Sequence, residues 1–196
     1  MTLDIVVSRY GEDMSWKEGL TLPCRLIVYN KDGTGLNPLP NVGREAHTYL
    51  HHMAVFHGRY PDWTIFTQGD PLRHCPDFIN IVNGWPDTMM KSAFYADPGL
   101  HFFSSEPVRF IESNPQGHDA ENNTFEMWEQ LFWDLLFYPM AFAPGAIFAI
   151  SSELLMRRSI AFYLKADELA ATRPRGPWEF ERIWAYLWTS SAATKL

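Results

Sequence analysis

The sequence predicts an α/β fold in which a mixed, mostly parallel sheet is flanked by helices. Short runs at residues 4–7, 25–29 and 63–67 are apolar and rich in β-branched and aromatic side chains, as buried strands are. Residues 44–56, between the second run and the third, have apolar side chains at helical spacing. Strands that alternate with helices pair in parallel, because each crossover helix returns the chain to the same end of the sheet.

Each of these predicted strands ends on polar residues. The endings are Ser8-Arg9-Tyr10, Asn30-Lys31-Asp32 and Gln68-Gly69-Asp70. The carboxyl ends of parallel strands lie at one edge of a sheet, where ligands of α/β proteins bind. The sequence therefore predicts a ligand site at this edge.

The remaining elements follow in chain order. Residues 12–20 have the pattern of a short helix, and Asn41 is a candidate cap for the helix at 44–56. Ser151 or Ser152 is expected to cap a later helix. Further expected elements are a strand near residues 101–103, a helix at 124–137, a strand at 146–150, a helix at 158–169 and a last helix after Gly176-Pro177.

The composition is that of a folded, acidic protein. The chain has 196 residues, of which 46% are apolar and 15% aromatic, so we expect one domain over residues 1–196. It would have a nucleotide-type front half to about residue 72 and a more irregular back half from about residue 73. The formal net charge is −7 with acids and bases interspersed, whereas a nucleic-acid surface would need a basic stripe.

The sequence also bears on location. No basic start precedes a long apolar segment, and residues 135–150 are interrupted by two prolines and a glycine, where a spanning helix would need about 20 apolar residues. Cys24 and Cys75 give no disulfide framework. We therefore expect a soluble, cytoplasmic protein without a signal peptide or transmembrane segment.

Asp70 is the first candidate site residue. A carboxylate beside a glycine at a strand end can hold Mg²⁺ or Mn²⁺, because these hard cations prefer oxygen ligands and bridge to phosphates. Gly69 would let the ligand approach the backbone. Gly-Asp-Pro is also ordinary turn chemistry, so both interpretations stay open.

Two predicted helix starts carry further candidates. Arg44 can donate two parallel hydrogen bonds to a phosphate at a helix N-terminus, whereas Glu45 complements the helix dipole and could simply pair with Arg44. Glu179 and Glu181 lie in the first turn of the last helix, where acids are stabilising. An acid in a pocket beside Trp178 could instead have its pKa raised and serve as a general base.

Other kinds of site are poorly supported. His47 and His51 lie four residues apart, beside His52, but the glutamate of an H-E-x-x-H zinc site is missing, and His74-Cys75 has no partners at ligand spacing. The chain has no G-x-x-x-x-G-K-[ST] loop, no G-x-G-x-x-G fingerprint and no G-x-S-x-G elbow. These absences argue against a P-loop protein, a Rossmann dinucleotide site and a serine hydrolase.

Several segments occur in a familiar order. IVVSRYGEDMSW, VYNK, LPNVGREAHTYLHHM, TIFTQGDP, GAIFAISSELL and WEFERIW together resemble the domain-of-unknown-function family 3431 over most of the chain. NVGRE…YL is also similar to the N-x-G-R-D…L segment of rhamnan-synthesis and capsular-polysaccharide glycosyltransferases. Both resemblances imply a GT-A-type glycosyltransferase fold. There, a nucleotide sugar lies over the first strands, and Mn²⁺ or Mg²⁺ joins its diphosphate to a D-x-D-like acid.

The resemblance also implies roles for individual residues. Gln68-Gly69-Asp70 occupies the place of the acidic motif but lacks its first acid, so Asp70 would hold the metal with Glu45 or waters. Glu179 or Glu181 would deprotonate the acceptor hydroxyl. The nucleotide would be bound by Arg9, Tyr10, Lys31, Arg44, Gln68 and Gly69.

The implied activity is the transfer of a hexose from a UDP-linked donor, with rhamnose or glucose as candidate sugars, to a saccharide acceptor with inversion, as in polysaccharide biosynthesis. One alternative is a catalytically degenerate module that binds sugar nucleotides or glycans, which the missing acid permits. Another is an interaction domain that docks through its tryptophans, although their helical spacing is more typical of a core. These tryptophans are Trp128, Trp133, Trp184 and Trp188.

Overall fold

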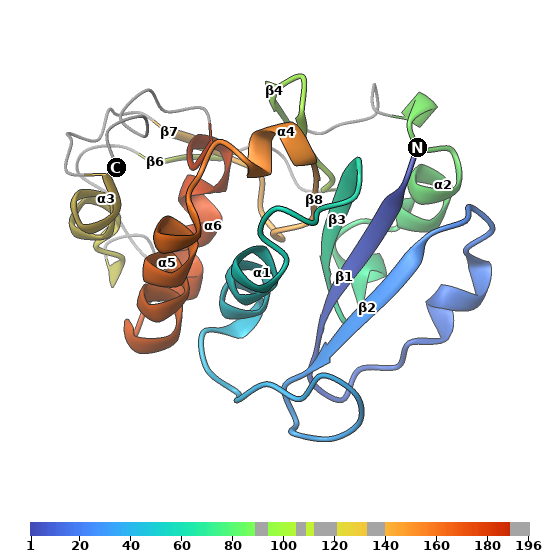
Figure 1. Ribbon diagram of the computed structural model, residues 1–196, viewed down its shortest axis with the longest axis horizontal. Coiled ribbons are helices and arrows are strands. Elements are labelled where there is room, and N and C mark those ends of the chain that lie inside the picture. The colour runs from blue at the N-terminus through green and yellow to red at the C-terminus, as the bar shows by residue number, and fades with distance from the viewer. Residues whose placement is uncertain (89–93, 105–108, 112–120, 133–139, 189–196) are drawn as a thin grey trace.

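The structure, a computed structural model, describes residues 1–88, 94–104, 109–111, 121–132 and 140–188. Within these residues, one mixed sheet has six strands in the order β2-β1-β3-β8-β5-β4, and a separate antiparallel pair joins β6 to β7 (Figure 1). The strands are β1 (Leu3–Arg9), β2 (Arg25–Asn30), β3 (Trp63–Gln68), β4 (Phe94–Asp97), β5 (Leu100–Phe102), β6 (Arg109–Ile111), β7 (Met140–Phe142) and β8 (Phe148–Ser151).

Fewer strands of the sheet pair in parallel than the sequence predicted. Strands β2, β1 and β3 pair in parallel, whereas β8, β5 and β4 add in antiparallel fashion. The expectation of a mixed α/β sheet flanked by helices is confirmed. Parallel pairing is confined to the three strands whose polar endings form the predicted ligand edge.

Helices cover both faces of the sheet. In Figure 1, α1, α5, α6 and α3 lie on one side of β1 and β3, and α2 lies on the other. None of the helices that the structure describes is both long and apolar enough to cross a membrane. The helices are α1 (Arg44–Val55), α2 (Phe78–Asn83), α3 (Thr124–Phe132), α4 (Ser152–Leu155), α5 (Ile160–Thr172) and α6 (Gly176–Ile183), with short 3-10 turns η1 (Ser15–Gly19), η2 (Pro71–Arg73) and η5 (Trp184–Tyr186).

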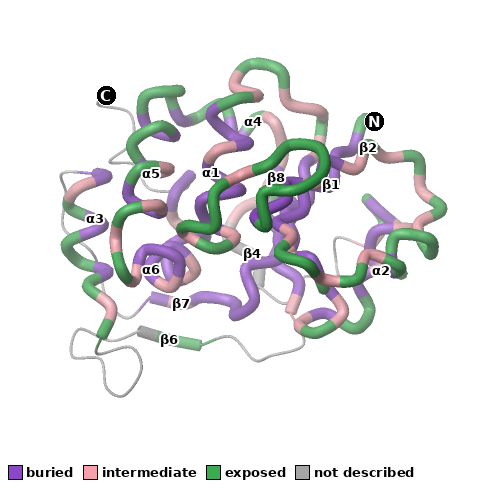
Figure 2. The backbone as a smooth tube through the Cα atoms, turned by 90° about the horizontal axis from the view of Figure 1, so that it is seen from below, coloured by how far each residue is buried: buried purple, intermediate pink, exposed green. Residues whose placement is uncertain are grey.

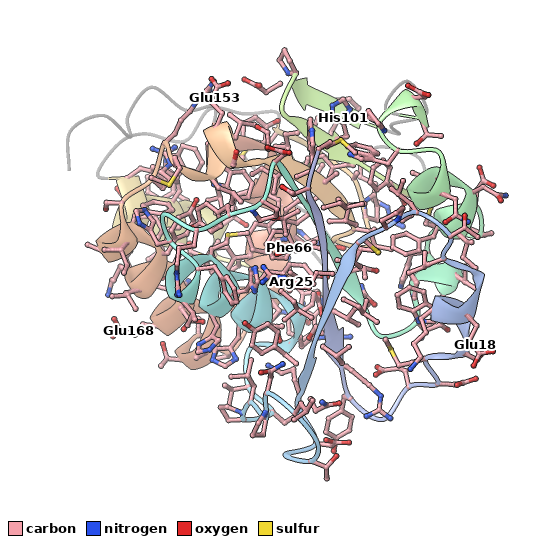
Figure 3. All side chains as sticks on the ribbon, turned by 45° about the vertical axis from the view of Figure 1, so that its right-hand side comes forward. Glu18, Arg25, Phe66, His101, Glu153 and Glu168 are labelled. Atoms are coloured by element: carbon pink, nitrogen blue, oxygen red, sulfur yellow. The ribbon has the colours of Figure 1, made fainter. Side chains whose placement is uncertain are left out.

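The middle residues of β1 and β3 are mostly apolar because both faces of the sheet are buried there. In β1, Val6 points into the core under α1, while its neighbours Ile5 and Val7 point into the core under α2. Phe66 of β3 lies in the middle of the molecule, whereas charged side chains such as Glu168 lie at its periphery (Figure 3). Seen from below, β7 is buried, whereas β6 is exposed (Figure 2).

The tryptophans that could have formed a docking surface belong to this core. Trp128, Trp184 and Trp188 are at most 4% exposed, and Trp133 lies outside the described residues. Trp184 packs its ring beside Tyr49 and Phe148, so it contributes to the packing of α6 against α1 and the sheet. For the three tryptophans that the structure describes, the core position that their helical spacing indicated is confirmed, and the alternative of a docking surface is wrong.

Several boundaries differ from the predicted ones. Gly43 is the N-cap residue of α1, and no side chain forms a capping hydrogen bond there, so Asn41 is not the cap. The short helix at 12–20 is the 3-10 turn η1. Ser151 caps α4 as expected, but Ser159 then caps a separate helix α5, so the helix at 158–169 begins later than predicted. Residues 133–137 of another predicted helix lie outside the described residues.

Candidate functional site

The polar strand endings lie at one edge of the sheet. In the parallel register, Ser8 of β1 lies beside Gln68 of β3, and Arg9 lies beside Asn30 of β2. In Figure 1 this is the lower edge, where β1 and β2 end and the chain continues toward α1. The hydroxyl of Ser8 is 2.9 Å from that of Thr48, so the end of β1 is tied directly to α1.

Arg9 stabilises this edge through its guanidinium. Its Nε donates to the carbonyl of Glu12 at 2.9 Å, and its Nη1 donates to Asn30 Oδ1 at 3.1 Å. The same Nη1 lies 3.5 Å from Asp32 Oδ2. Tyr10, the next residue, is 58% exposed and free to contact a ligand from its ring. Arg9 thus orders the ends of β1 and β2, and Tyr10 projects from them.

Asp70 is exposed beside a hollow of about 420 Å³. It precedes η2 as its N-cap residue but makes no side-chain cap bond. Gly69, before it, is buried, and its carbonyl accepts a hydrogen bond of 2.8 Å from Trp16 Nε1. A side chain at Gly69 would collide with the Glu12 carboxylate. The hollow is lined by Glu12, Asp13, Ser15, Trp16, Asp70 and Leu72.

The side chains around Asp70 offer oxygen ligands of the kind that a hard divalent cation prefers. Too few of them are placed to hold such a cation by themselves. The oxygens of Asp13 accept bonds from the N–H and hydroxyl of Ser15, and Glu12 accepts from the N–H of Tyr10. Within the described segments, no group of three or more His, Cys, Asp or Glu side chains is placed to hold a metal ion. Mg²⁺ is usually held by one or two carboxylates, waters and substrate phosphates, so Asp70 fits such a cation only together with a phosphorylated ligand.

Arg44 presents its side chain to solvent at the start of α1. Both Gly43 and Arg44 have left-handed backbone conformations, with φ of 61° and 45°, an arrangement rarely adopted by a residue other than glycine. The Arg44 side chain is 60% exposed, and its guanidinium lies 5.2 Å from the ring centre of Trp178. Trp178 thus gives the cation an aromatic platform from α6.

Glu45 lies beside Arg44 but faces inward. Its side chain is 17% exposed, and its Oε2 is 3.7 Å from Arg44 Nε. Burial raises the pKa of the Glu45 carboxyl, and the charge of Glu181 acts in the same direction, against Arg44 and Lys31. Sequence reasoning treated Glu45 mainly as a helix-start acid, because its approach to Glu181 depends on how α1 packs against α6.

Glu181 is joined to the end of β3 through one glycine. The N–H of Gly145 donates to Glu181 Oε1 at 2.7 Å, and Gln68 Nε2 donates to the carbonyl of Gly145 at 2.8 Å. The other oxygen of Glu181 accepts from Arg182 at 3.1 Å. Gly145 has φ of 98° and packs against His74, which leaves little room for a larger residue. The glycine that opens GAIFAI was the available signal for this link.

Glu179 is placed quite differently from Glu181. Its side chain is 2% exposed, and its Oε2 accepts from Arg173 Nε at 2.7 Å. Its Oε1 accepts from the backbone N–H of Asn123 at 2.7 Å. Glu179 therefore joins the end of α5 to the start of α3 through a buried ion pair, and both of its oxygens are already bound.

Lys31 is also turned inward, with 4% of the residue exposed. Its Nζ donates to the carbonyl of Val42 at 2.6 Å and lies 3.1 Å from His47 Nδ1. Burial lowers the pKa of Lys31 to about 8, although the charges of Glu45 and Asp167 oppose this shift. A nucleotide could reach this amine only after these contacts break.

His47 and His51 of α1 face an aspartate of α5, whereas His52 lies in the interior. His47 Nε2 and His51 Nδ1 lie 3.7 Å and 3.8 Å from the two oxygens of Asp167 on α5. His52 is fully buried, stacks on Phe56 and is 3.1 Å from the hydroxyl of Tyr29. Burial lowers the pKa of His52 to about 3, so the ring is neutral.

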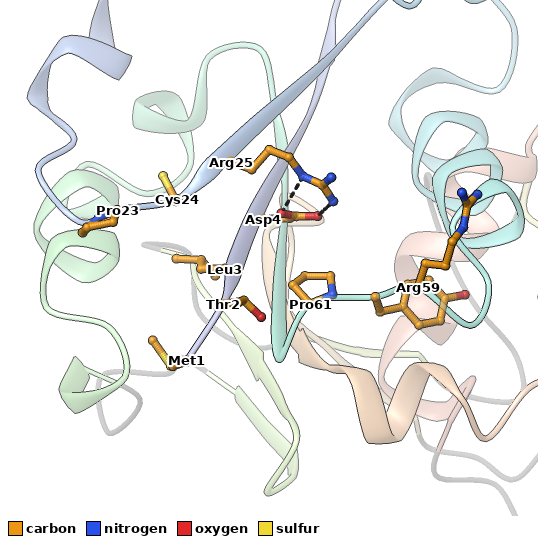
Figure 4. A pocket seen from close by; sticks show the side chains of 10 residues that line it. Met1, Thr2, Leu3, Asp4, Pro23, Cys24, Arg25, Arg59 and Pro61 are labelled. Atoms are coloured by element: carbon orange, nitrogen blue, oxygen red, sulfur yellow. Dashed lines mark hydrogen bonds and ion pairs between the residues drawn. The ribbon is translucent and has the colours of Figure 1, made fainter.

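A larger hollow of about 620 Å³ lies at the opposite, amino edge of β1 and β2 (Figure 4). There Arg25, whose side chain is 56% exposed, donates from Nε and Nη2 to the two oxygens of the buried Asp4. Arg59 lies at the rim and donates to the carbonyl of Val55. The charge of Arg25 is therefore paired with that of Asp4 at this edge.

The fold and the site define a mixed α/β protein whose polar residues gather at the carboxyl ends of parallel strands. The chain belongs to a family described as "Protein of unknown function (DUF3431)", whose profile matches residues 5–194. No curated protein and no solved structure matches it. Membership of the family is thus established, and its description names no activity.

Proposed function

We propose that this protein is a glycosyltransferase that moves a hexose from a UDP-linked donor to a saccharide acceptor. The observation that carries the proposal is a meeting of distant segments at one edge. Exposed Arg44 and Asp70 lie near the ends of the parallel strands, and Glu181 of α6 is joined to the end of β3 through Gly145. Nucleotides bind at such edges of α/β sheets.

The chain's own residues supply the parts that the reaction needs. The acceptor hydroxyl attacks the anomeric carbon, and the diphosphate leaves with the electron pair of the broken C–O bond. Glu181 takes the hydroxyl proton, and Arg44 stabilises the charge that develops on the diphosphate. A divalent cation held by Asp70 would add positive charge at the same place. Attack without a protein nucleophile inverts the anomeric carbon.

Glu181 is a better candidate for the base than Glu179. Its side chain is 19% exposed and lies in the carboxyl-edge site, whereas Glu179 is 2% exposed. Both oxygens of Glu179 are held by Arg173 and Asn123. The oxygens of Glu181 also accept hydrogen bonds, from Gly145 and Arg182, so the preference rests on exposure. A base must reach the proton that it removes, and a buried carboxylate is poorly suited to the task.

The residues expected to bind the nucleotide also differ in exposure. Arg44, Tyr10 and Asp70 are exposed and could contact a donor directly, while Gln68 is bonded to Gly145 and would act by holding that loop. Gly69 is buried against the Glu12 carboxylate, so it would act by making room for that side chain rather than by contacting the phosphates. Lys31 and Arg9 are engaged with protein groups and would support the edge from within.

Thermal unfolding tests the proposal. A ligand that binds only the folded state raises the unfolding temperature, so UDP with Mn²⁺ should stabilise the protein more than UDP alone. Slow hydrolysis of UDP-glucose or UDP-rhamnose, measured as release of UDP, should accompany the stabilisation. An absence of stabilisation by UDP at any Mn²⁺ concentration would contradict the proposal.

A second candidate is a module that binds sugar nucleotides without turning them over. It is favoured by the small number of acids near Asp70, because the described residues hold no group of three metal ligands. Stabilisation by UDP without hydrolysis of any UDP-sugar would support this module over the enzyme.

A further inference from the structure

Lys31 connects three elements at the base of the carboxyl edge. Its backbone N–H donates to the carbonyl of Arg9 at 2.8 Å, which fixes it beside the end of β1. Its side chain turns inward and donates to the carbonyl of Val42, just before α1. It also reaches His47 of α1 at 3.1 Å. The amine is thus held by groups on both sides of the turn that opens α1.

The bonding pattern sets the protonation of His47. An ammonium group has only protons to donate, so His47 Nδ1 must accept from Lys31 and the ring must be neutral. Burial also lowers the pKa of His47, with Lys31 and His51 acting in the same direction and Asp167 opposing them. The proton on Nε2 then faces Asp167 Oδ1 at 3.7 Å. Lys31 thus donates to His47, and the N–H on the other side of the His47 ring points toward Asp167.

The turn that Lys31 contacts has a backbone conformation that its surroundings must stabilise. Val42 precedes Gly43 and Arg44, which are both left-handed, and such conformations persist only when their surroundings determine them. A side chain on Gly43 would lie 2.5 Å from the carbonyl of Ala170 in α5, so the turn is pressed against that helix. Arg44 follows directly and projects over Trp178.

We propose that Lys31 is a positioning residue, whose buried amine holds the Val42–Gly43–Arg44 turn so that Arg44 faces a phosphate-bearing ligand. This inference rests on the proposed nucleotide site. The resemblance implied that Lys31 contacts the nucleotide directly. Here Lys31 instead acts through Arg44. The charged groups that face the amine are Glu45 of α1 and Asp167 of α5, with His47 and His51 beside them.

The test compares Lys31→Met with wild type and with Lys165→Met, which removes an exposed lysine of α5. Inorganic pyrophosphate is the probe, and its affinity is measured by calorimetry between pH 6.5 and pH 9.5, a range chosen around the lowered pKa of Lys31, about 8. Wild type and Lys165→Met should bind more weakly as Lys31 loses its charge. Lys31→Met should bind about tenfold more weakly at pH 7 and lack that pH-dependent step.

A second readout does not depend on any ligand. In the free protein, the backbone amide NMR signals of Gly43 and Arg44 should shift with a midpoint near pH 8, the lowered pKa of Lys31, and this transition should vanish in Lys31→Met. If wild type fails to bind pyrophosphate, the proposed nucleotide site fails, while these amide signals still decide the role of Lys31.

Two results would overturn the inference. One is weaker pyrophosphate binding in Lys31→Met with unchanged Gly43 and Arg44 signals, since that pattern means direct contact with the ligand. The other is unaltered affinity and pH profile. If Lys31→Met does not fold, Lys31→Gln is used instead, because its amide can still donate to Val42 but cannot titrate. It should bind pyrophosphate at every pH about as wild type does at pH 9.5, because its neutral amide resembles the deprotonated amine, and so lack the pH-dependent step.

Discussion

The backbone N–H of Gly145 donates a hydrogen bond to Glu181 across 36 residues of sequence. The carbonyl of the same glycine accepts from Gln68 at the end of β3. The two peptide groups that flank Gly145 therefore link the end of β3 to α6. The carboxylate proposed as the base is held by the backbone N–H of Gly145 on one oxygen and by Arg182 on the other.

Asp70→Ala should abolish the Mn²⁺ dependence of UDP binding, because it removes the exposed carboxylate proposed to hold the cation. Wild type should gain about 2.7 kcal/mol of stability at a ligand concentration 100 times Kd, measured from the shift in unfolding temperature. Asp87→Ala removes an exposed aspartate that does not line the hollow and should behave as wild type. A Mn²⁺ effect that persists in Asp70→Ala contradicts the assignment.

Glu181→Gln should lower the rate of sugar transfer by about 100-fold or more, since the amide cannot accept the hydroxyl proton. Its oxygen can still accept from Gly145, but the buried Arg182 loses the charge of Glu181, so the unfolding temperature should fall by about 2–4 °C, equivalent to about 1 kcal/mol. The rate is measured as UDP release from a UDP-sugar in the presence of an acceptor. A variant as active as wild type would exclude Glu181 as the base.

Glu179→Gln should instead reduce stability, by about 2 kcal/mol in urea unfolding, because it weakens the bonds to Arg173, which then keeps only its longer ion pair with Glu126. Glu168→Gln is the matched control, since Glu168 pairs with Lys165 at the surface, and it should change stability by about 0.5 kcal/mol or less. A stable Glu179→Gln protein without transferase activity would move the catalytic role to Glu179.

His52 should make the fold sensitive to acid. Its pKa is lowered by burial from 6.5 to about 3, so below pH 6.5 the unfolded chain takes up a proton that the folded protein refuses. Stability is fully present above pH 6.5 and should fall by about 1.4 kcal/mol for each pH unit toward pH 3. His52→Phe should flatten this part of the profile in urea unfolding measured from pH 7 to pH 4. Equal slopes for the two proteins would mean that His52 is not responsible.

Gly43→Ala should destabilise the protein far more than Gly58→Ala. Both glycines have positive φ, so alanine is strained at either position, by about 1 kcal/mol. Only at Gly43 would the added carbon also lie 2.5 Å from the backbone oxygen of Ala170, while nothing lies within 4 Å at Gly58. A further loss of about 2 kcal/mol is expected from this overlap, measured by urea unfolding. Similar losses for both variants would show that α5 yields at this contact.

Much of the front half could be predicted because its signals are local. The strand at 63–67 and the helix at 44–56 appear within one residue of their predicted ends, since period and composition depend only on nearby residues. The antiparallel strands β8, β5 and β4 were harder to foresee. Their direction depends on which edge each strand joins, and no local pattern records that choice.

The sequence by itself determined where the strands and helices lie and which polar residues follow them. Only the tertiary structure decided which of those residues face solvent. Lys31 and Glu179 turn inward because helices α1, α5 and the start of α3 supply partners for their charges, whereas Arg44 and Asp70 remain exposed. Burial of a charge depends on partners brought from distant segments, so it is settled by packing and not by neighbours in sequence.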